Sequence, residues 1–217
     1  MIFKIEPFKD ELAKYAYEEG MEELKRFWGI NWIESTPNII LIKNRAEMDE
    51  FVGRKTENWM VGSAIASNSV RAVVVFGFEN INSESVNHYD EIGYKALIKH
   101  EICHLFFGIA SKGSGAPTWL KEGVSIYASG QLKTSFWKKP IRFDGFLDAN
   151  KDNMMKAYGE GGFVVEFLVN KFGKEKLIQI IKSLPDLSKH ENFLEKFKEI
   201  YGFELSYEKI NKLYLEN

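Results

Sequence analysis

Residues 97–108 read LIKHEICHLFFG, and the HExxH pattern inside this stretch is the feature on which the fold assignment depends. On a helix, His100 and His104 lie about 40° apart around the axis, so both imidazoles face one side and can hold a single ion. Glu101 is rotated by about 100° from His100, which makes it a poor third ligand but lets its carboxylate reach a water at the metal. The spacing therefore predicts two metal ligands and a general base.

A catalytic zinc site needs a third protein ligand, and residues 117–123, PTWLKEG, supply a carboxylate at Glu122 on the next expected helix. Together, HEICHLFFG and PTWLKEGVSIY resemble the gluzincin metallopeptidases, in which a glutamate on the helix after the HExxH helix completes the zinc site. The resemblance is to the catalytic core shared by the thermolysin-like and aminopeptidase branches. It implies a zincin-like fold, one zinc ion per chain held by His100, His104 and Glu122, and a peptidase with Glu101 as general base.

A second stretch, residues 157–168 (AYGEGGFVVEFL), resembles the aminopeptidase-branch pattern of a tyrosine, a small residue and a helix that ends in glycine. In that family the tyrosine hydroxyl stabilises the oxyanion of the tetrahedral intermediate, so the resemblance implies this role for Tyr158. The alternative is an aromatic residue at the start of a helix that packs on the core.

The strand expected over residues 70–78 bears on the substrate. Gluzincins hold an extended substrate along the edge strand before the zinc helix, so the resemblance implies a peptide or protein substrate bound along residues 70–78 by strand addition. Residues 77–80, GFEN, faintly resemble the element with which the aminopeptidases bind the substrate N-terminus. A plain strand end is the favoured interpretation, so exopeptidase activity is not predicted.

Two other classes of function stay open. A zinc-binding interaction protein could retain the gluzincin fold and its ligands without turnover, although Glu101 and Tyr158 are both present. A structural domain with a chance HExxH sequence would bind no stoichiometric zinc.

Four further residues lie near the motifs or are of a metal-binding type, but they are not expected to belong to the metal site. Cys103 is expected to be a small buried residue rather than a thiolate ligand, and Tyr127 a core residue. His88 and His190 have no motif around them and are expected at the surface.

The composition is ordinary for a globular protein of 217 residues, with 45% hydrophobic and 28% charged residues. With 29 basic and 31 acidic residues, the net charge of -2 gives no electrostatic reason to expect nucleic acid or an anionic membrane as partner. No apolar run approaches the roughly 20 residues of a membrane helix, and the first residues do not read as a secretory signal. A single cysteine, Cys103, excludes an internal disulfide, and a cytoplasmic protein is expected.

The remaining elements follow from periodicity and from turn residues. Helices are expected over residues 8–28, 45–52, 91–109, 118–130, 158–172, 174–184, 188–201 and 207–215. Strands are expected at 38–43, near Trp59 and at 70–78, with a turn at 62–69 and an irregular segment at 131–155.

Strands in the first half and helices in the second predict an α+β, zincin-like fold in one catalytic domain over residues 1–217. Its N-terminal α/β lobe (1–110) carries the HExxH helix, its C-terminal lobe (111–217) is mostly helical, and the metal lies in the cleft between them.

Overall fold

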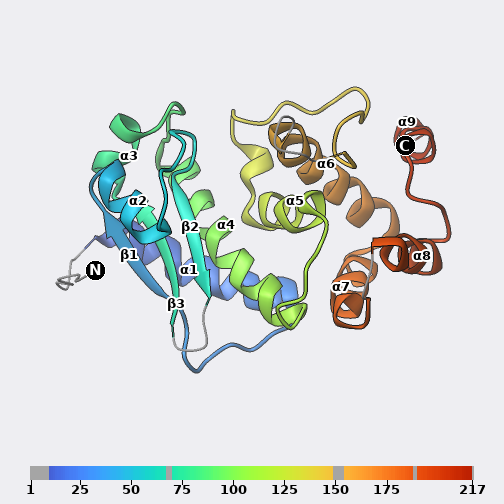
Figure 1. The fold of residues 1–217 in the computed structure, drawn as a ribbon, viewed down its shortest axis with the longest axis horizontal. Helices are drawn as coiled ribbons and strands as arrows, with labels where there is room; N and C mark the ends of the chain where they lie inside the picture. Colours follow the sequence, from blue (N-terminus) through green and yellow to red (C-terminus); the bar gives the residue numbers. More distant parts are fainter. Residues whose placement is uncertain (1–9, 67–69, 149–153, 188–189, 217) are drawn as a thin grey trace.

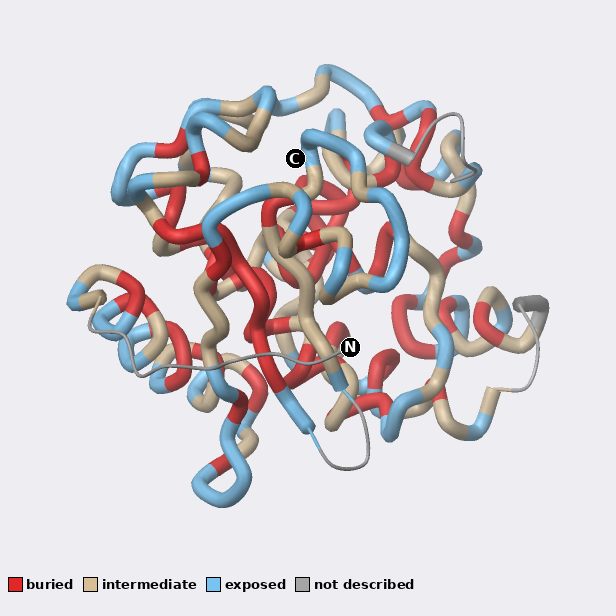
Figure 2. Tube along the Cα trace, turned by 60° about the vertical axis from the view of Figure 1, so that its left-hand side comes forward, coloured by how far each residue is buried: buried red, intermediate tan, exposed pale blue. Residues whose placement is uncertain are grey.

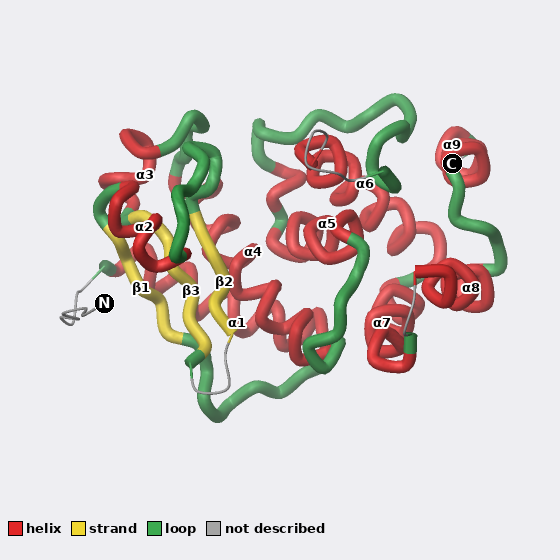
Figure 3. Tube along the Cα trace, viewed as in Figure 1, coloured by secondary structure: helices red, strands yellow, loops and turns green. Residues whose placement is uncertain are grey.

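The computed structural model describes residues 10–66, 70–148, 154–187 and 190–216, and it combines a small sheet with a majority of helices (Figures 1 and 3). In chain order the elements are α1 (Glu11–Trp28), β1 (Asn38–Ile42), α2 (Arg45–Val52), β2 (Gly62–Ala66), β3 (Arg71–Phe76), α3 (Phe78–Glu84), α4 (Glu91–Ala110), α5 (Thr118–Ser129), η1 (Gln131–Lys133), α6 (Met154–Phe172), α7 (Lys174–Ser183), η2 (Leu184–Asp186), α8 (His190–Tyr201) and α9 (Tyr207–Leu215), where η marks a short 3-10 helix. The α+β fold class predicted from the sequence is confirmed.

The sheet has the strand order β1-β3-β2, in which β1 runs parallel and β2 antiparallel to β3. The central strand is buried from Ala72 to Phe76, whereas its neighbours are mostly half-buried (Figure 2). Because β3 is hydrogen-bonded on both sides, its backbone is not free to pair with a substrate. The strand within residues 70–78 is therefore not an edge strand, contrary to the expectation; the edge strands are β1 and β2. The binding of a substrate to the sheet stays a prediction.

The predicted turn at residues 62–69 is also wrong in part, because residues 62–66 form β2 itself. The segment was predicted as a turn because it contains glycine and serine. The glycine is needed because β2 packs directly on α4, where Gly62 lies against the side chain of Glu101.

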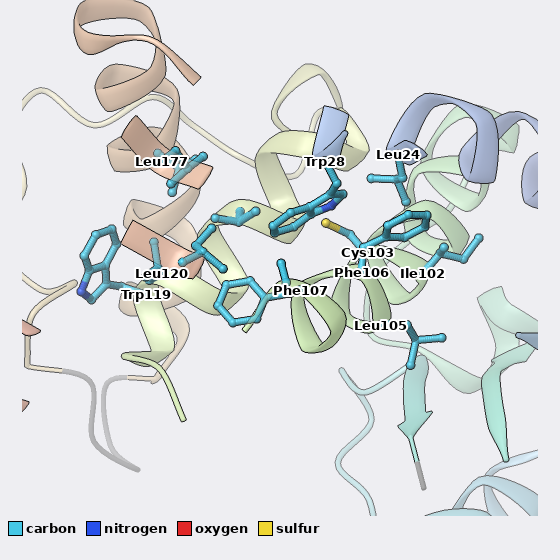
Figure 4. Close-up of a cluster of buried hydrophobic side chains, with 14 of the residues drawn as sticks. Leu24, Trp28, Ile102, Cys103, Leu105, Phe106, Phe107, Trp119, Leu120 and Leu177 are labelled. Carbon is cyan, nitrogen blue, oxygen red and sulfur yellow. The ribbon is translucent and has the colours of Figure 1, made fainter. Parts of the chain in front are cut away.

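Helix α4 is the central element of the molecule, since it packs against β2 and β3 on one side and against α1 and α5 on others. Asp90 caps its first turn by accepting a hydrogen bond from the backbone N–H of Gly93 at 2.7 Å. Figure 4 shows side chains of α4 such as Cys103 and Phe107 packed with Trp28 of α1; the Trp28 and Phe107 rings meet edge to face at 6.0 Å. Although α4 is 20 residues long and apolar on most faces, no helix in the described ranges has the length and apolarity that a membrane span requires.

Helices α5 and α6 approach each other through two glycines. A Cβ on Gly123 would lie 2.4 Å from the carbonyl oxygen of Gly161, and a Cβ on Gly161 would lie 2.7 Å from that of Trp119. Only glycine allows backbones this close. The contact places Glu122, next to Gly123, and Tyr158, one turn before Gly161, in the same region between the helices.

The irregular segment before α6 is held in place by two polar side chains, the buried Glu160 and the half-buried Asn211. Glu160 of α6 accepts hydrogen bonds from the backbone N–H groups of Asp144, Gly145 and Phe146. Asn211 of α9 donates to the carbonyl oxygen of Phe143 and accepts from its N–H. Helix α6 begins at Met154, one turn earlier than predicted, so Tyr158 lies inside the helix rather than at its start.

Candidate metal centre

Two helices bring three potential metal ligands together. On α4, the Nε2 atoms of His100 and His104 are 3.0 Å apart. From α5, Glu122 places its Oε2 atom 3.5 Å from Nε2 of His100 and 3.2 Å from Nε2 of His104. His100 and Glu122 are buried and His104 is half-buried. The three residues form a group of ligand atoms that could hold one metal ion, at the positions the sequence predicted.

Ser125, which the sequence analysis did not single out, orients His104. The Ser125 hydroxyl donates its one proton to the carbonyl oxygen of Lys121 at 3.2 Å and lies 3.1 Å from Nδ1 of His104. Having donated that proton, it can only accept from Nδ1, so His104 carries a proton on Nδ1 and turns Nε2 toward the cluster. The signal in the sequence was the position of Ser125, three residues after Glu122 on the same face of α5.

The donor set fits a cation. A metal ion bound to Nε2 of His104 would replace the proton with which this atom hydrogen-bonds to Glu122. A cation at the centre satisfies all three groups at once, and two imidazoles with one carboxylate are ligands that zinc takes in catalytic sites. By contrast, Nδ1 of His100 is buried and makes no hydrogen bond in the described part of the chain, although the side chain of Gln131 approaches this imidazole.

The positive and negative groups of the cluster favour each other's charged forms, which shifts the pKa values of Glu122 and His100. Burial alone would raise the pKa of Glu122, but the charge of His104 and the hydrogen bonds from both imidazoles hold it far below its usual range. Burial likewise would lower the pKa of His100, yet the hydrogen bond with Glu122 and the negative charges of Glu101 and Glu122 raise it. Glu122 is therefore ionised at neutral pH, as a metal ligand must be.

Glu101 lies beside the cluster and is buried between α4 and β2. A Cβ on Gly62 would come within 2.9 Å of both Cγ and Oε1 of Glu101, so the first residue of β2 must be glycine for the carboxylate to occupy this position. Glu101 and all three candidate ligands line one cavity of about 560 Å³. The carboxylate that the sequence predicted as general base thus opens on the same space as the ligands.

Tyr158 reaches the same cavity from α6. Burial raises the pKa of its phenol, and the negative charges of Glu122 and Glu101, together with a hydrogen bond to Glu122, raise it further. The hydroxyl therefore keeps its proton at neutral pH and lies next to a candidate ligand. Tyr158 and Glu122 are 36 residues apart in the chain, yet both line this cavity.

Three residues that the sequence did not assign to the site, Cys103, Tyr127 and His88, lie away from the cluster. Cys103 is buried in the core against Trp28, and burial raises the pKa of its thiol to about 12. Tyr127 packs against Phe27 of α1 with ring centroids 6.2 Å apart. His88 is exposed, and the side chain of His190 lies outside the described part of the structure.

Most of the chain matches one protein family. The family model described as the Peptidase MA superfamily matches residues 44–215, a range that includes every element from α2 to α9. No curated protein and no solved structure matches the chain.

Proposed function

The chain belongs to the peptidase MA superfamily, and on this premise we propose that it is a zinc-dependent peptidase of the gluzincin type. The observation that carries the proposal is the convergence of His100, His104 and Glu122 within 3.5 Å, with Glu101 on the same cavity. A protein that only bound a metal would not need a carboxylate at the position of Glu101, which is not one of the three candidate ligands.

Zinc fits the three residues because catalytic zinc sites use three protein ligands of these types and leave one position open. When bound, zinc would polarise a substrate carbonyl and lower the pKa of a water in the site. His100, His104 and Glu122 would hold it.

The remaining steps belong to side chains of the chain itself. Glu101 accepts the proton of the attacking water and returns it to the leaving amine, which is general acid–base catalysis by one carboxylate. Tyr158, protonated at neutral pH, donates a hydrogen bond to the carbonyl oxygen as it becomes negative. Both groups line the same cavity from different elements, α4 and α6.

The substrate is a peptide that extends the sheet at β2. Residues Gly62, Ser63, Ala64 and Ala66 of this edge strand line the cavity, and within the described residues the side of β2 that faces away from β3 has no strand partner. A peptide added there would run past Glu101, since Gly62 contacts that side chain, and its backbone would be held by hydrogen bonds independent of sequence.

Replacement of Glu101 by glutamine tests the proposal. We expect Glu101→Gln to keep one zinc per chain and the wild-type fold but to lose hydrolysis of a peptide library, because an amide cannot accept the proton. Glu91→Gln, an exposed acid at the start of the same helix, is the control and should cleave as the wild type does.

Two outcomes would count against the proposal. Near wild-type hydrolysis by Glu101→Gln would remove Glu101 from the mechanism. A wild-type protein with one zinc per chain that cleaves no peptide of a diverse library would instead be a metal-binding protein without turnover.

A further inference from the structure

The segment between α2 and β2, residues 53–61, forms one wall of the cavity that holds the candidate metal centre. Its residues Arg54, Trp59, Met60 and Val61 line that cavity. None of them belongs to either sequence motif. This wall faces α6, because the rings of Trp59 and Tyr158 meet edge to face with centroids 6.4 Å apart.

A single arginine holds this wall in place. Nη1 of Arg45 donates to the carbonyl oxygen of Glu57 at 3.0 Å and to that of Met60, and Nη2 donates to that of Asn58 at 3.4 Å. The carbonyls on both sides of Trp59 therefore bind one guanidinium. Arg45 holds the backbone on both sides of Trp59, and the side chain of Trp59 points toward α6, where it contacts Tyr158.

The same guanidinium is anchored on the body of the molecule. It donates to the carbonyl oxygen of Glu84 at the end of α3 and lies over the ring of Phe76 in β3, 4.8 Å from the centroid. Arg45 thus links the wall to the sheet and to α3. A lysine could not replace it, since the three donors on one ammonium nitrogen cannot reach all four carbonyls that the two Nη atoms bind.

The residues that line the cavity include five with neutral, mostly aromatic side chains, which we call the aromatic end: Trp59, Tyr89, Leu97, Phe136 and Trp137. The rings of Tyr89 and Phe136 lie 5.1 Å apart. Leu97 precedes His100 by one turn of α4, so the aromatic end begins next to the metal ligands.

Two glycines lie against rings of the aromatic end. Gly93 lies on the same face of α4, two turns before His100, and a Cβ there would come within 4.0 Å of Phe136. A Cβ on Gly159 would lie 3.2 Å from the ring of Trp137. The ring of Trp137 would have to shift to accommodate a side chain at Gly159, whereas a Cβ on Gly93 would make an ordinary contact with Phe136.

We propose that the aromatic end is a subsite for an aromatic or large apolar side chain of the peptide next to the scissile bond, with Trp59 as a specificity-determining residue and Arg45 as the residue that positions it. The proposal rests on the peptidase function proposed above. An aromatic side chain seated there leaves water for a largely apolar surface, whereas an alanine side chain gains little.

The test compares peptides with phenylalanine or alanine at each position next to the scissile bond, in hydrolysis by the wild type and in binding to zinc-loaded Glu101→Gln. We expect phenylalanine to be preferred at one position, and the phenylalanine-to-alanine ratio of kcat/KM to fall about 10- to 100-fold in Trp59→Ala, with a smaller fall in Trp59→Phe. Lys55→Ala, a change on the same segment of a side chain that is 94% exposed, should keep the wild-type ratio.

Arg45→Ala and Arg45→Lys separate positioning from general stability. Both should raise KM for the phenylalanine peptide with little change in its kcat, and both should keep one zinc per chain. Equal losses for the two peptides would mean that Arg45 only stabilises the fold, and would overturn its positioning role.

The outcomes distinguish this inference from the proposed function. Hydrolysis without a preference for phenylalanine, or an unchanged ratio in Trp59→Ala, overturns the subsite and leaves the peptidase standing. Selective binding of the phenylalanine peptide that Trp59→Ala abolishes, without hydrolysis by the wild type, supports the subsite and refutes the peptidase.

Discussion

At the residue scale, Ser125 orients the imidazole of His104, because its hydroxyl donates a hydrogen bond to the carbonyl oxygen of Lys121 and accepts one from Nδ1 of His104. Ser125→Ala should therefore weaken metal binding about 10- to 100-fold, as loss of such a supporting hydrogen bond does in other metal sites. Competition with a chelator at fixed pH measures the affinity. The matched control is Ser129→Ala on the same helix, where the serine is also buried but donates to Ile126 and touches no ligand.

If Ser125→Ala and Ser129→Ala bind the metal with the same affinity, the hydrogen bond to Nδ1 does not orient His104. An equal loss in both variants would point to a general effect on α5 instead.

Tyr158 offers a second test at this scale, of the mechanism rather than of the metal. Tyr158→Phe should lower kcat by about 10² to 10³ while KM and metal content stay nearly unchanged, because the hydrogen bond strengthens only as the carbonyl oxygen becomes negative. Steady-state kinetics on one peptide gives both constants. Tyr127→Phe is the control, since that ring packs on Phe27 away from the cavity, and an equal loss there would refute the assignment.

The sequence could predict those residues whose relationship is local. His100, Glu101 and His104 lie on adjacent turns of one helix, so a spacing rule describes them. Ser125 is separated from its partner by 21 residues and required the packing of α5 on α4. Arg45 was not predicted at all, because its partners are backbone carbonyls, which any residue type supplies.

At the element scale, the crossing of α5 and α6 depends on glycine, because a Cβ on Gly123 would lie 2.4 Å from a backbone oxygen that cannot turn away. Gly123→Ala should destabilise the protein by about 1–3 kcal/mol, the usual cost of overpacking, and should weaken metal binding because Glu122 is its neighbour. Denaturant unfolding and chelator competition measure the two effects.

Gly108→Ala is the control for this change. Gly108 lies inside α4, where a Cβ would meet nothing within 4 Å, so alanine should stabilise the helix by up to about 1 kcal/mol. If the denaturation midpoint of Gly123→Ala is at or above that of the wild type, then α5 and α6 can move apart without loss of stability, and the prediction is wrong.

Element types were predicted well where the apolar period was strong, and poorly where packing overrides local preference. The spacing in α4 gave its N-cap at Asp90 and its length to within one residue. The small residues of β2 carry no strand signal of their own, since the strand exists through its pairing with β3 and its contact with α4. Which strand lies at the edge is a property of the sheet and cannot be read from one segment.

At the scale of the whole molecule, the buried apolar side chains form one cluster that extends from α1 to α9. The candidate ligands lie where α4 of the first half meets α5 of the second. The division into lobes at residue 110 and a single domain over the chain stays a prediction. What the sequence lacked was the packing of the halves, which depends on contacts such as that of Gly123 with Gly161.

Because this core does not depend on an ion, removal of the metal should leave the molecule folded, in contrast to a zinc finger, where metal binding provides the folding free energy. We expect the chelated protein to keep its helical circular dichroism and to unfold cooperatively. Added zinc at 100 times its Kd should contribute about 2.7 kcal/mol, which for a chain of this size raises Tm by roughly 5–10 °C. His104→Ala should show no such shift on addition of zinc. Loss of the helical signal on chelation would mean instead that the ligands hold the two halves of the molecule together.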